Sequence, residues 1–304
     1  MGIDEAADGF IRHVKYEKRY SAHTVTSYRA DLKQFSAFLL TAYDGMSDLD
    51  AIAHHHIRSW LADIKEKRPR VKATTLNHKI SSLASFYKYA LREGLVEKNP
   101  VRQLHALRKP ERLPVSLQES QTSHLMEEIA FGPGLRGFTD RLICELLYST
   151  GMRRQELVML RETDIAWSMK LIRVLGKGNK ERMIPVSEAL MDELREYIAA
   201  KKRELEKCDR EFLLVLQNGK PVYAGYVYRT VKAHLAQVTT QQKRSPHVLR
   251  HTFATQLLNN GANIQAIKDL LGHSSLAATQ VYTHTDIERL KEIHKAAHPR
   301  ENGS

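Results

Sequence analysis

The sequence predicts a mainly helical protein with a small antiparallel β-sheet, divided between two domains. Apolar residues recur at three- and four-residue spacing through most of the chain, which is typical of amphipathic helices. Two short apolar segments joined by a glycine-rich turn occur only in the second half, and they predict a small sheet there. Residues 108–114 hold two prolines and four charges and read as an interdomain linker. At 304 residues, the chain is long enough for two hydrophobic cores.

The first 107 residues predict helices alone. Helices are expected over Thr24–Leu40, with Ser21 as N-cap, then over Ile57–Lys65 and Thr74–Arg92. Gly94 marks the end of the third of these helices. Its buried stripe should comprise Leu76, Ile80, Leu83, Tyr87 and Leu91.

The opposite face of the Thr74–Arg92 helix carries small polar and basic side chains. They are Thr74, His78, Ser81 and Ser85, followed by Arg92. Such residues on one helix face suit contact with a DNA groove or with phosphates. A plain solvated face has the same pattern, so the residue types alone leave both interpretations open.

After the linker, residues 115–304 predict a mostly helical domain with the sheet at one side. Helices are expected first, strands follow, and helices return from Ala224 onward. The expected helices are Gln118–Ile129 and Arg136–Ser149, and the expected strands are Leu171–Leu175, Arg182–Val186 and Phe212–Leu216.

The composition indicates a polyanionic partner. The formal net charge is +12 and the isoelectric point is about 9.6, and double-stranded DNA fits dispersed basic residues better than a membrane surface does. A merely basic protein is the alternative.

Two cysteines are too few for a disulfide framework or a zinc ribbon. With no secretion signal and no apolar run of about 20 residues, we expect a cytoplasmic protein.

Six residues in the second half form a set suited to phosphodiester chemistry. They supply two guanidiniums, an ammonium, two imidazoles and a phenol, which can hold a phosphate, neutralise added charge and attack phosphorus. No cofactor and no metal are expected. The residues are Arg153, Lys177, His247, Arg250, His273 and Tyr282.

Three of these six residues have a competing interpretation. Arg153 follows a glycine at a helix start and could simply pair with Glu156. Lys177 lies in a glycine-rich turn and could protonate a leaving oxygen, but the turn could also be a plain solvated hairpin, and Lys180 in the same turn is the rival for the acid role. Tyr282 is one of 12 tyrosines, so residue type alone does not select it.

Two motif-based alternatives can be dropped. The Gly-Lys-Gly-Asn turn at Gly176 lacks the spacing of a nucleotide-binding loop. His247 and His251 have the spacing of a zinc-protease helix, but Val248 stands where that motif requires glutamate. His251 should be packed or hydrogen-bonded inside the domain.

Five motifs in order resemble the tyrosine recombinase family, and in particular its bacterial Xer branch. They read G-M-R-R-Q-E-L, G-K-G-N-K-E-R, H-V-L-R-H, L-G-H and V-Y-T-H, and they contain the six residues above. The segment Ser21–Phe35 resembles the family's DNA-clamping domain. The resemblance covers nearly the whole chain.

The resemblance implies a C-shaped DNA clamp in which a helical SAM-like core-binding domain, residues 1–107, is linked to an α+β catalytic domain, residues 115–304. It implies that Tyr282 attacks a DNA phosphate and forms a 3′-phosphotyrosyl link, while the two arginines and two histidines stabilise the phosphorus centre. Lys177 would protonate the 5′ oxygen. It also favours DNA contact by the Thr74–Arg92 face.

The resemblance further implies a homo- or hetero-tetramer on two DNA sites, tethered through a C-terminal helix at Ile287–Ala297 and passing through a four-way junction. A second Xer recombinase and the septal DNA translocase FtsK are possible partners, with chromosome-dimer resolution as the role. A mobile-element integrase, a relaxing enzyme like a type IB topoisomerase and a non-catalytic DNA-binding module stay open as alternatives.

Overall fold

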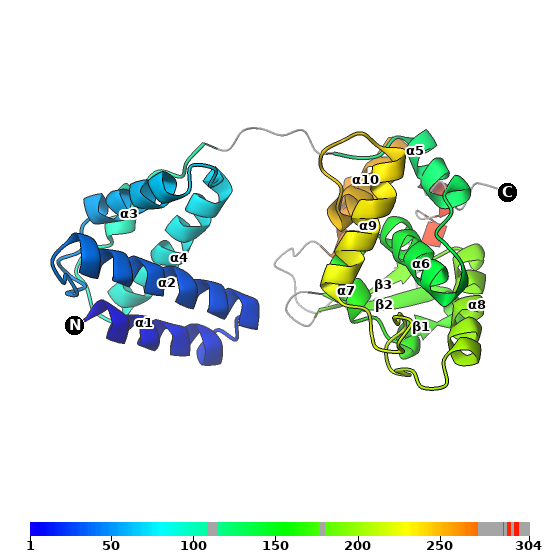
Figure 1. The fold of residues 1–304 in the computed structure, drawn as a ribbon, viewed down its shortest axis with the longest axis horizontal. Helices are drawn as coiled ribbons and strands as arrows, with labels where there is room; N and C mark the ends of the chain where they lie inside the picture. The colour runs from blue at the N-terminus through cyan, green and yellow to red at the C-terminus, as the bar shows by residue number, and fades with distance from the viewer. Residues whose placement is uncertain (109–114, 177–179, 273–287, 289–290, 293–294, 298–304) are drawn as a thin grey trace. The chain divides into compact units, whose positions relative to one another are not determined.

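The computed structural model of the chain describes residues 1–108, 115–176, 180–272, 288, 291–292 and 295–297. The chain divides into two compact units, Met1–Arg112 and Leu113–Ser304, each with its own hydrophobic core (Figure 1).

The N-terminal unit is helical, as the sequence predicts. Its elements are α1 (Ile3–Arg12), a π turn (His13–Glu17), α2 (Ala22–Ala42), α3 (His54–Lys67), α4 (Ala73–Arg92) and a 3₁₀ turn (Pro100–Gln103). The predicted N-cap is confirmed, because the Ser21 hydroxyl accepts a hydrogen bond from the Thr24 N–H at 3.2 Å. Helix α1 is an addition to the predicted elements, and it packs against α2 and α4.

Aromatic side chains dominate the core of this unit. Phe35 lies against Trp60 with ring centroids 5.0 Å apart, and Phe10 contacts Phe86 at 5.7 Å. The predicted stripe of α4 is buried at four of its five positions, and the exception, Leu91, is half-buried. The stripe therefore fixes which face of α4 turns to the core and which remains for other contacts.

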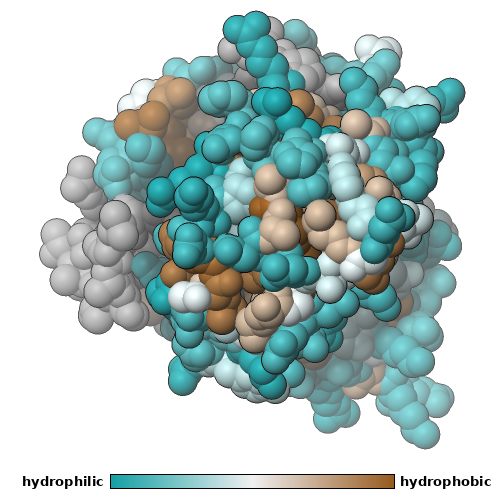
Figure 2. All heavy atoms as spheres, turned by 90° about the vertical axis from the view of Figure 1, so that its left-hand side faces the viewer, coloured by the Kyte–Doolittle hydropathy of each residue, from teal (hydrophilic) through white to brown (hydrophobic). Residues whose placement is uncertain are grey.

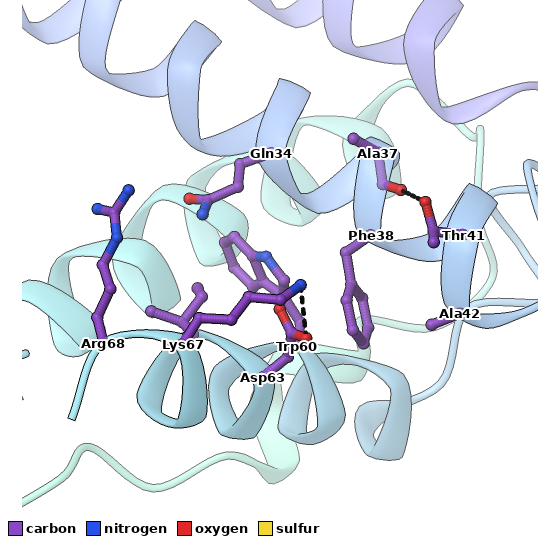
Figure 3. A pocket seen from close by; sticks show the side chains of 10 residues that line it. Gln34, Ala37, Phe38, Thr41, Ala42, Trp60, Asp63, Lys67 and Arg68 are labelled. Carbon is purple, nitrogen blue, oxygen red and sulfur yellow. Dashed lines mark hydrogen bonds and ion pairs between the residues drawn. The ribbon is translucent and has the colours of Figure 1, made fainter.

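A cavity of about 340 Å³ opens between α2 and α3. Figure 3 shows the ring of Phe38 and the indole of Trp60 lining it, with Gln34 and Lys67 beside them. The face of this unit that is turned to the viewer in Figure 2 is mainly hydrophilic, with separate apolar areas. None of the residues predicted above to contact DNA lines the cavity.

The C-terminal unit is built around α6, which contacts α7, α8, α9 and α10 (Figure 1). Its helices are α5 (Glu119–Ser123), a π turn (His124–Glu128), α6 (Gly134–Thr150), α7 (Arg154–Val158), α8 (Glu188–Glu204), α9 (Ala224–Val238), α10 (Pro246–Asn259) and α11 (Ile264–Leu271), with 3₁₀ turns at Glu162–Asp164 and Trp167–Met169. Its strands are β1 (Ile165–Ala166), β2 (Leu171–Leu175) and β3 (Glu181–Pro185).

The sheet is antiparallel in the order β1-β2-β3, with Ile172 opposite Ile184. Strand β2 has the predicted bounds, and β3 begins and ends one residue earlier than predicted. Helix α11 contacts both β3 and α10, so the end of α11 meets the sheet and the α10 helix at one place.

The prediction of a strand at 212–216 is wrong. Phe212 and Val215 form only isolated bridges, to Arg161 and Pro221. The backbone here has mixed partners: the Leu213 N–H donates to the Leu160 carbonyl at 2.8 Å, whereas the Tyr197 hydroxyl accepts from the Val215 N–H at 3.1 Å and Lys201 donates to the Phe212 carbonyl at 2.7 Å. Pro221 lies opposite Val215 at a position that needs no N–H, because the Leu216 N–H donates to the Lys220 carbonyl at 2.8 Å and the Val222 N–H donates to the Leu214 carbonyl at 3.1 Å on either side of it.

Candidate active site

A glycine in the left-handed backbone conformation sets the position of Arg153. Helix α6 ends at Thr150, and Gly151 follows with φ of 59°, a conformation that glycine adopts without steric cost. Arg153 then takes an extended conformation as the N-cap of α7, and Glu156 in the first turn of α7 faces back toward it. The short turn thus sets an arginine and a carboxylate side by side.

We expect Gly151→Ala to destabilise the C-terminal unit strongly. An added Cβ would lie 2.5 Å from Phe253 Cδ1 and 2.8 Å from Leu271 Cδ2. The left-handed backbone costs about 1–2 kcal/mol for alanine, and overpacking adds about 1–3 kcal/mol. The free energy of unfolding should therefore fall by about 2–5 kcal/mol.

Gly261→Ala is the matched control for this prediction. Gly261 also has a positive φ, 87°, but no atom lies within 4 Å of its Cβ position, so only the backbone cost applies. Urea unfolding followed by the fluorescence of Trp167, in a Trp60→Phe background, measures both variants in the same unit. If the free energy of unfolding fell equally in the two variants, a packing role for Gly151 would be contradicted.

The first turn of α10 supplies His247 and Arg250. Pro246 occupies the first helical position after the N-cap Ser245, as predicted, so both side chains lie on one face. The Arg250 guanidinium donates to the Gly151 carbonyl and, at 2.7 Å, to the Leu271 carbonyl. Arg250 therefore connects the glycine turn to the end of α11.

Arg153 reaches the same helix end. Its guanidinium donates to Glu156 Oε1 at 2.7 Å and to the Gly272 carbonyl at 3.0 Å, and its side chain stays 34% exposed. The carboxylate pairing considered from the sequence is thus present, and part of the guanidinium still faces solvent. The structure brings Arg153 and Arg250, which are far apart in sequence, to neighbouring carbonyls.

Electrostatics of this cluster favour an anion. Burial, together with the positive charges of Arg153 and Arg182, lowers the pKa of Arg250 to about 10. Burial also lowers the pKa of His247, with Arg250 and Arg154 adding to the effect. A phosphate placed here would relieve this repulsion between cations, and His247, neutral near pH 7, could donate or accept a hydrogen bond.

Sequence reasoning missed Arg182 and gave Glu156 only as a possible partner of Arg153. Both are buried, and Arg182 donates to both oxygens of Glu156, at 3.0 and 2.7 Å. Both residues lie within the motifs quoted above: Glu156 in G-M-R-R-Q-E-L, and Arg182 as the last residue of G-K-G-N-K-E-R. A buried role for an arginine in a strand cannot be read from the strand pattern alone.

Several predicted residues cannot be placed. Lys177, His273 and Tyr282 lie outside the described residues. Lys180 is described and exposed, and its carbonyl accepts from the Gly176 N–H at 2.7 Å, which closes the base of the turn. His251 is half-buried, and burial lowers its pKa.

The predicted DNA-contacting face of α4 is accessible but already engaged. Thr74, His78 and Ser81 are exposed and Ser85 is half-buried. The His78 ring contacts Asp31 Oδ2 at 3.2 Å, and Ser85 Oγ lies 3.3 Å from the Tyr28 hydroxyl. Asp31 on α2 also accepts from Lys79 at 2.7 Å and from Ser82 at 2.6 Å, which ties α4 to α2.

The described part of the chain has neither a metal-binding cluster nor a membrane-spanning helix. No group of three or more His, Cys, Asp or Glu residues in it is arranged to hold a metal ion. Within the same residues, every helix is too short or too polar to cross a bilayer.

Comparison with known proteins identifies the class. Residues 116–289 match the model of the phage integrase family, and residues 7–94 match the family's N-terminal SAM-like domain. The chain therefore belongs to the phage integrase family, whose members are tyrosine recombinases, and it is an enzyme of that class.

Curated relatives extend the match over the whole chain. Tyrosine recombinase XerC of Staphylococcus saprophyticus is 37% identical over 98% of this chain and 98% of the relative. Tyrosine recombinase XerC of Bacillus subtilis is 34% identical over 96% and 95%. Tyrosine recombinase XerD of Staphylococcus saprophyticus is 31% identical over 98% of this chain and 100% of the relative. The chain is therefore similar to both XerC and XerD recombinases.

A solved structure supports the fold alone. The Tn1549 transposon integrase in complex with transposon right end DNA is 22% identical, with a TM-score of 0.69 over 95% of this chain and 98% of that one. This likeness supports the mainly helical architecture with a small antiparallel sheet in the present chain.

Proposed function

We propose that the chain recombines DNA at a specific site by the following steps. The Tyr282 oxygen attacks a DNA phosphate, a P–O bond to the 5′ oxygen breaks, and a 3′-phosphotyrosyl link forms. Lys177 gives the leaving 5′ oxygen a proton. Because one phosphoester replaces another, no cofactor or external energy source is needed.

The convergence of Arg153 and Arg250 carries this proposal. Their guanidiniums donate to the Gly272 and Leu271 carbonyls, directly before the segment that leads to Tyr282. Two arginines at this point can fork hydrogen bonds onto the phosphate and stabilise the five-coordinate phosphorus. His247, on the same face of α10 as Arg250, and His273 would complete the set.

We propose the following division of labour. Residues 1–107 clamp the duplex with the α4 face, including Thr74, His78, Ser81 and Ser85, and Lys180 contacts DNA from the turn. Residues 108–114 link this clamp to the catalytic domain, residues 115–304. The two compact units and their separate cores support the division.

The C-terminal helix at Ile287–Ala297 is proposed to tether protomers in a tetramer on two DNA sites. One contact supports a docking surface on α10: Ala297 is 2% exposed among Phe253 and Leu257, and Asn260 donates to its carbonyl at 2.8 Å. A cytoplasmic tetramer, with a second Xer recombinase and FtsK as partners, would resolve chromosome dimers through a Holliday junction.

Sequencing the DNA that is covalently trapped on the protein in its own cell tests this role. A single chromosomal site supports dimer resolution. Trapped ends of a mobile element would instead favour an integrase, and widely dispersed sites would favour a relaxing enzyme. A failure to trap any DNA while the protein still binds DNA would support a non-catalytic binding module.

Affinity for duplex DNA should fall steeply with salt. The net charge of +12 implies that phosphate contacts dominate binding, and each contact releases counterions. For roughly six to ten contacts, affinity should drop on the order of 10³–10⁵-fold between about 50 and about 200 mM salt, linearly on logarithmic axes. Fluorescence anisotropy across a salt series measures how the affinity depends on salt. An affinity that does not change with salt would show that phosphate contacts do not dominate binding.

A further inference from the structure

Arg182 is a charged side chain that the proposed chemistry does not use, and it is almost completely buried. It lies on β3, and its side chain is 4% exposed. Two of its nitrogens donate to the two oxygens of Glu156, and Nε donates to the Leu270 carbonyl at 2.8 Å. Burying a guanidinium costs free energy unless it is paired and hydrogen-bonded, as it is here.

Glu156 is shared between Arg182 and Arg153. Arg182 holds both carboxylate oxygens, whereas the Arg153 guanidinium holds only Oε1, at 2.7 Å. Bidentate pairing is the stronger of the two arrangements. Arg182 therefore takes most of the carboxylate's charge, and Arg153 keeps a guanidinium that is partly exposed and not fully neutralised.

The end of α11 offsets the repulsion between the arginines. Three successive carbonyls at this helix end, those of Leu270, Leu271 and Gly272, accept from Arg182, Arg250 and Arg153 respectively. The last carbonyls of a helix lack partners within the helix, and the helix dipole places negative charge there. One helix end thus gathers side chains from β3, α10 and the start of α7.

The packing at this point leaves little freedom. Gly272 has φ of 62°, and a Cβ there would lie 3.1 Å from Arg182 Cδ and 3.2 Å from its Nη1. The Arg182 side chain therefore lies directly against the residue that precedes position 273.

We propose that Arg182 is a positioning residue for strand transfer: it neutralises Glu156 so that Arg153 keeps its charge for the DNA phosphate, and it fixes the end of α11 before the tyrosine-bearing segment. This inference rests on the proposed function. Without Arg182, Arg153 is the guanidinium left beside a buried carboxylate. Arg153 would then pair with both oxygens of Glu156, and its charge would be withdrawn from DNA.

The test compares single-turnover formation of the covalent adduct on a nicked suicide duplex at saturating protein. Arg182→Met should slow the adduct on the order of 10²-fold, as expected when a catalytic group is misplaced, with little change in the Kd for DNA. The double variant Arg182→Met with Glu156→Gln removes the unpaired charge and should recover much of the rate.

Lys201→Met is the matched control. Lys201 is 1% exposed, pairs with Glu162 at 2.8 Å and donates to the Phe212 carbonyl, so it is also a buried cation of this unit. It contacts neither Arg153 nor Glu156 in these interactions. If loss of any buried cation slowed the reaction through instability, Lys201→Met would slow it as much as Arg182→Met, and the proposal would be overturned.

A second substrate separates charge from folding. A methylphosphonate at the scissile position has no negative charge, so it needs less positive charge from Arg153. The defect of Arg182→Met should shrink on this substrate. An undiminished defect there, or no rescue by Glu156→Gln, overturns the proposal. Absence of any adduct with the unaltered protein would instead contradict the proposed function.

Discussion

Tyr282→Phe should bind duplex DNA as tightly as the unaltered protein and form no covalent adduct with a nicked suicide substrate. Phenylalanine keeps the aromatic ring but has no oxygen to attack phosphorus, so the chemical step is removed outright. A gel that separates protein from protein–DNA adducts under denaturing conditions gives the first measurement. Anisotropy on the same duplex gives the second.

Tyr228→Phe is the matched control for this change. Tyr228 lies on α9 and is 39% exposed, so loss of its hydroxyl should leave both adduct and affinity unchanged. If Tyr282→Phe still formed an adduct, the nucleophile would be another of the chain's 12 tyrosines.

Lys177→Ala should cleave ordinary DNA on the order of 10²–10⁴-fold more slowly, because the 5′ oxygen must then leave without a proton. A 5′-thiol leaving group has a far lower pKa and needs no proton. On DNA with that substitution, Lys177→Ala should therefore cleave almost normally. Single-turnover rates on the two substrates measure the difference.

Arg250→Ala and Lys180→Ala complete this experiment. Arg250→Ala should be slow on both substrates, because it removes charge from the phosphate and leaves the Gly151 and Leu271 carbonyls without this donor. At saturating protein, where the loss of one proposed DNA contact does not limit the rate, Lys180→Ala should cleave both substrates nearly as the unaltered protein does. If Lys177→Ala were equally slow on both substrates, Lys177 would position the phosphate and Lys180 would become the candidate acid.

Elements with strong local signals could be predicted from the sequence. The stripe of α4 and the N-cap at Ser21 follow from spacing and residue type, and strand β2 has its predicted bounds. Helix α8 was not predicted, although Ser187 caps it and its buried residues have helical spacing. The local sequence therefore contains enough information to predict α8.

Other features depend on contacts that no local pattern contains. Residues 212–216 are apolar enough for a strand, but they form only isolated bridges, and side chains from α6 and α8 take part of the backbone hydrogen bonding. The motifs singled out Arg153 and Arg250, yet their meeting at the end of α11 requires the tertiary fold. The burial of Arg182 beside Glu156 could not be predicted for the same reason.

The carboxylate of Asp31 has a consequence for the entropy of DNA binding. It holds His78, Lys79 and Ser82 on α4 before any ligand arrives. Ordering a flexible side chain on binding costs about 0.5–1.5 kcal/mol, and side chains that are already ordered avoid most of that loss. Of these three, His78 is exposed and belongs to the face of α4 that we propose to contact DNA, so this side chain is ordered before binding and DNA contact by it should cost less conformational entropy.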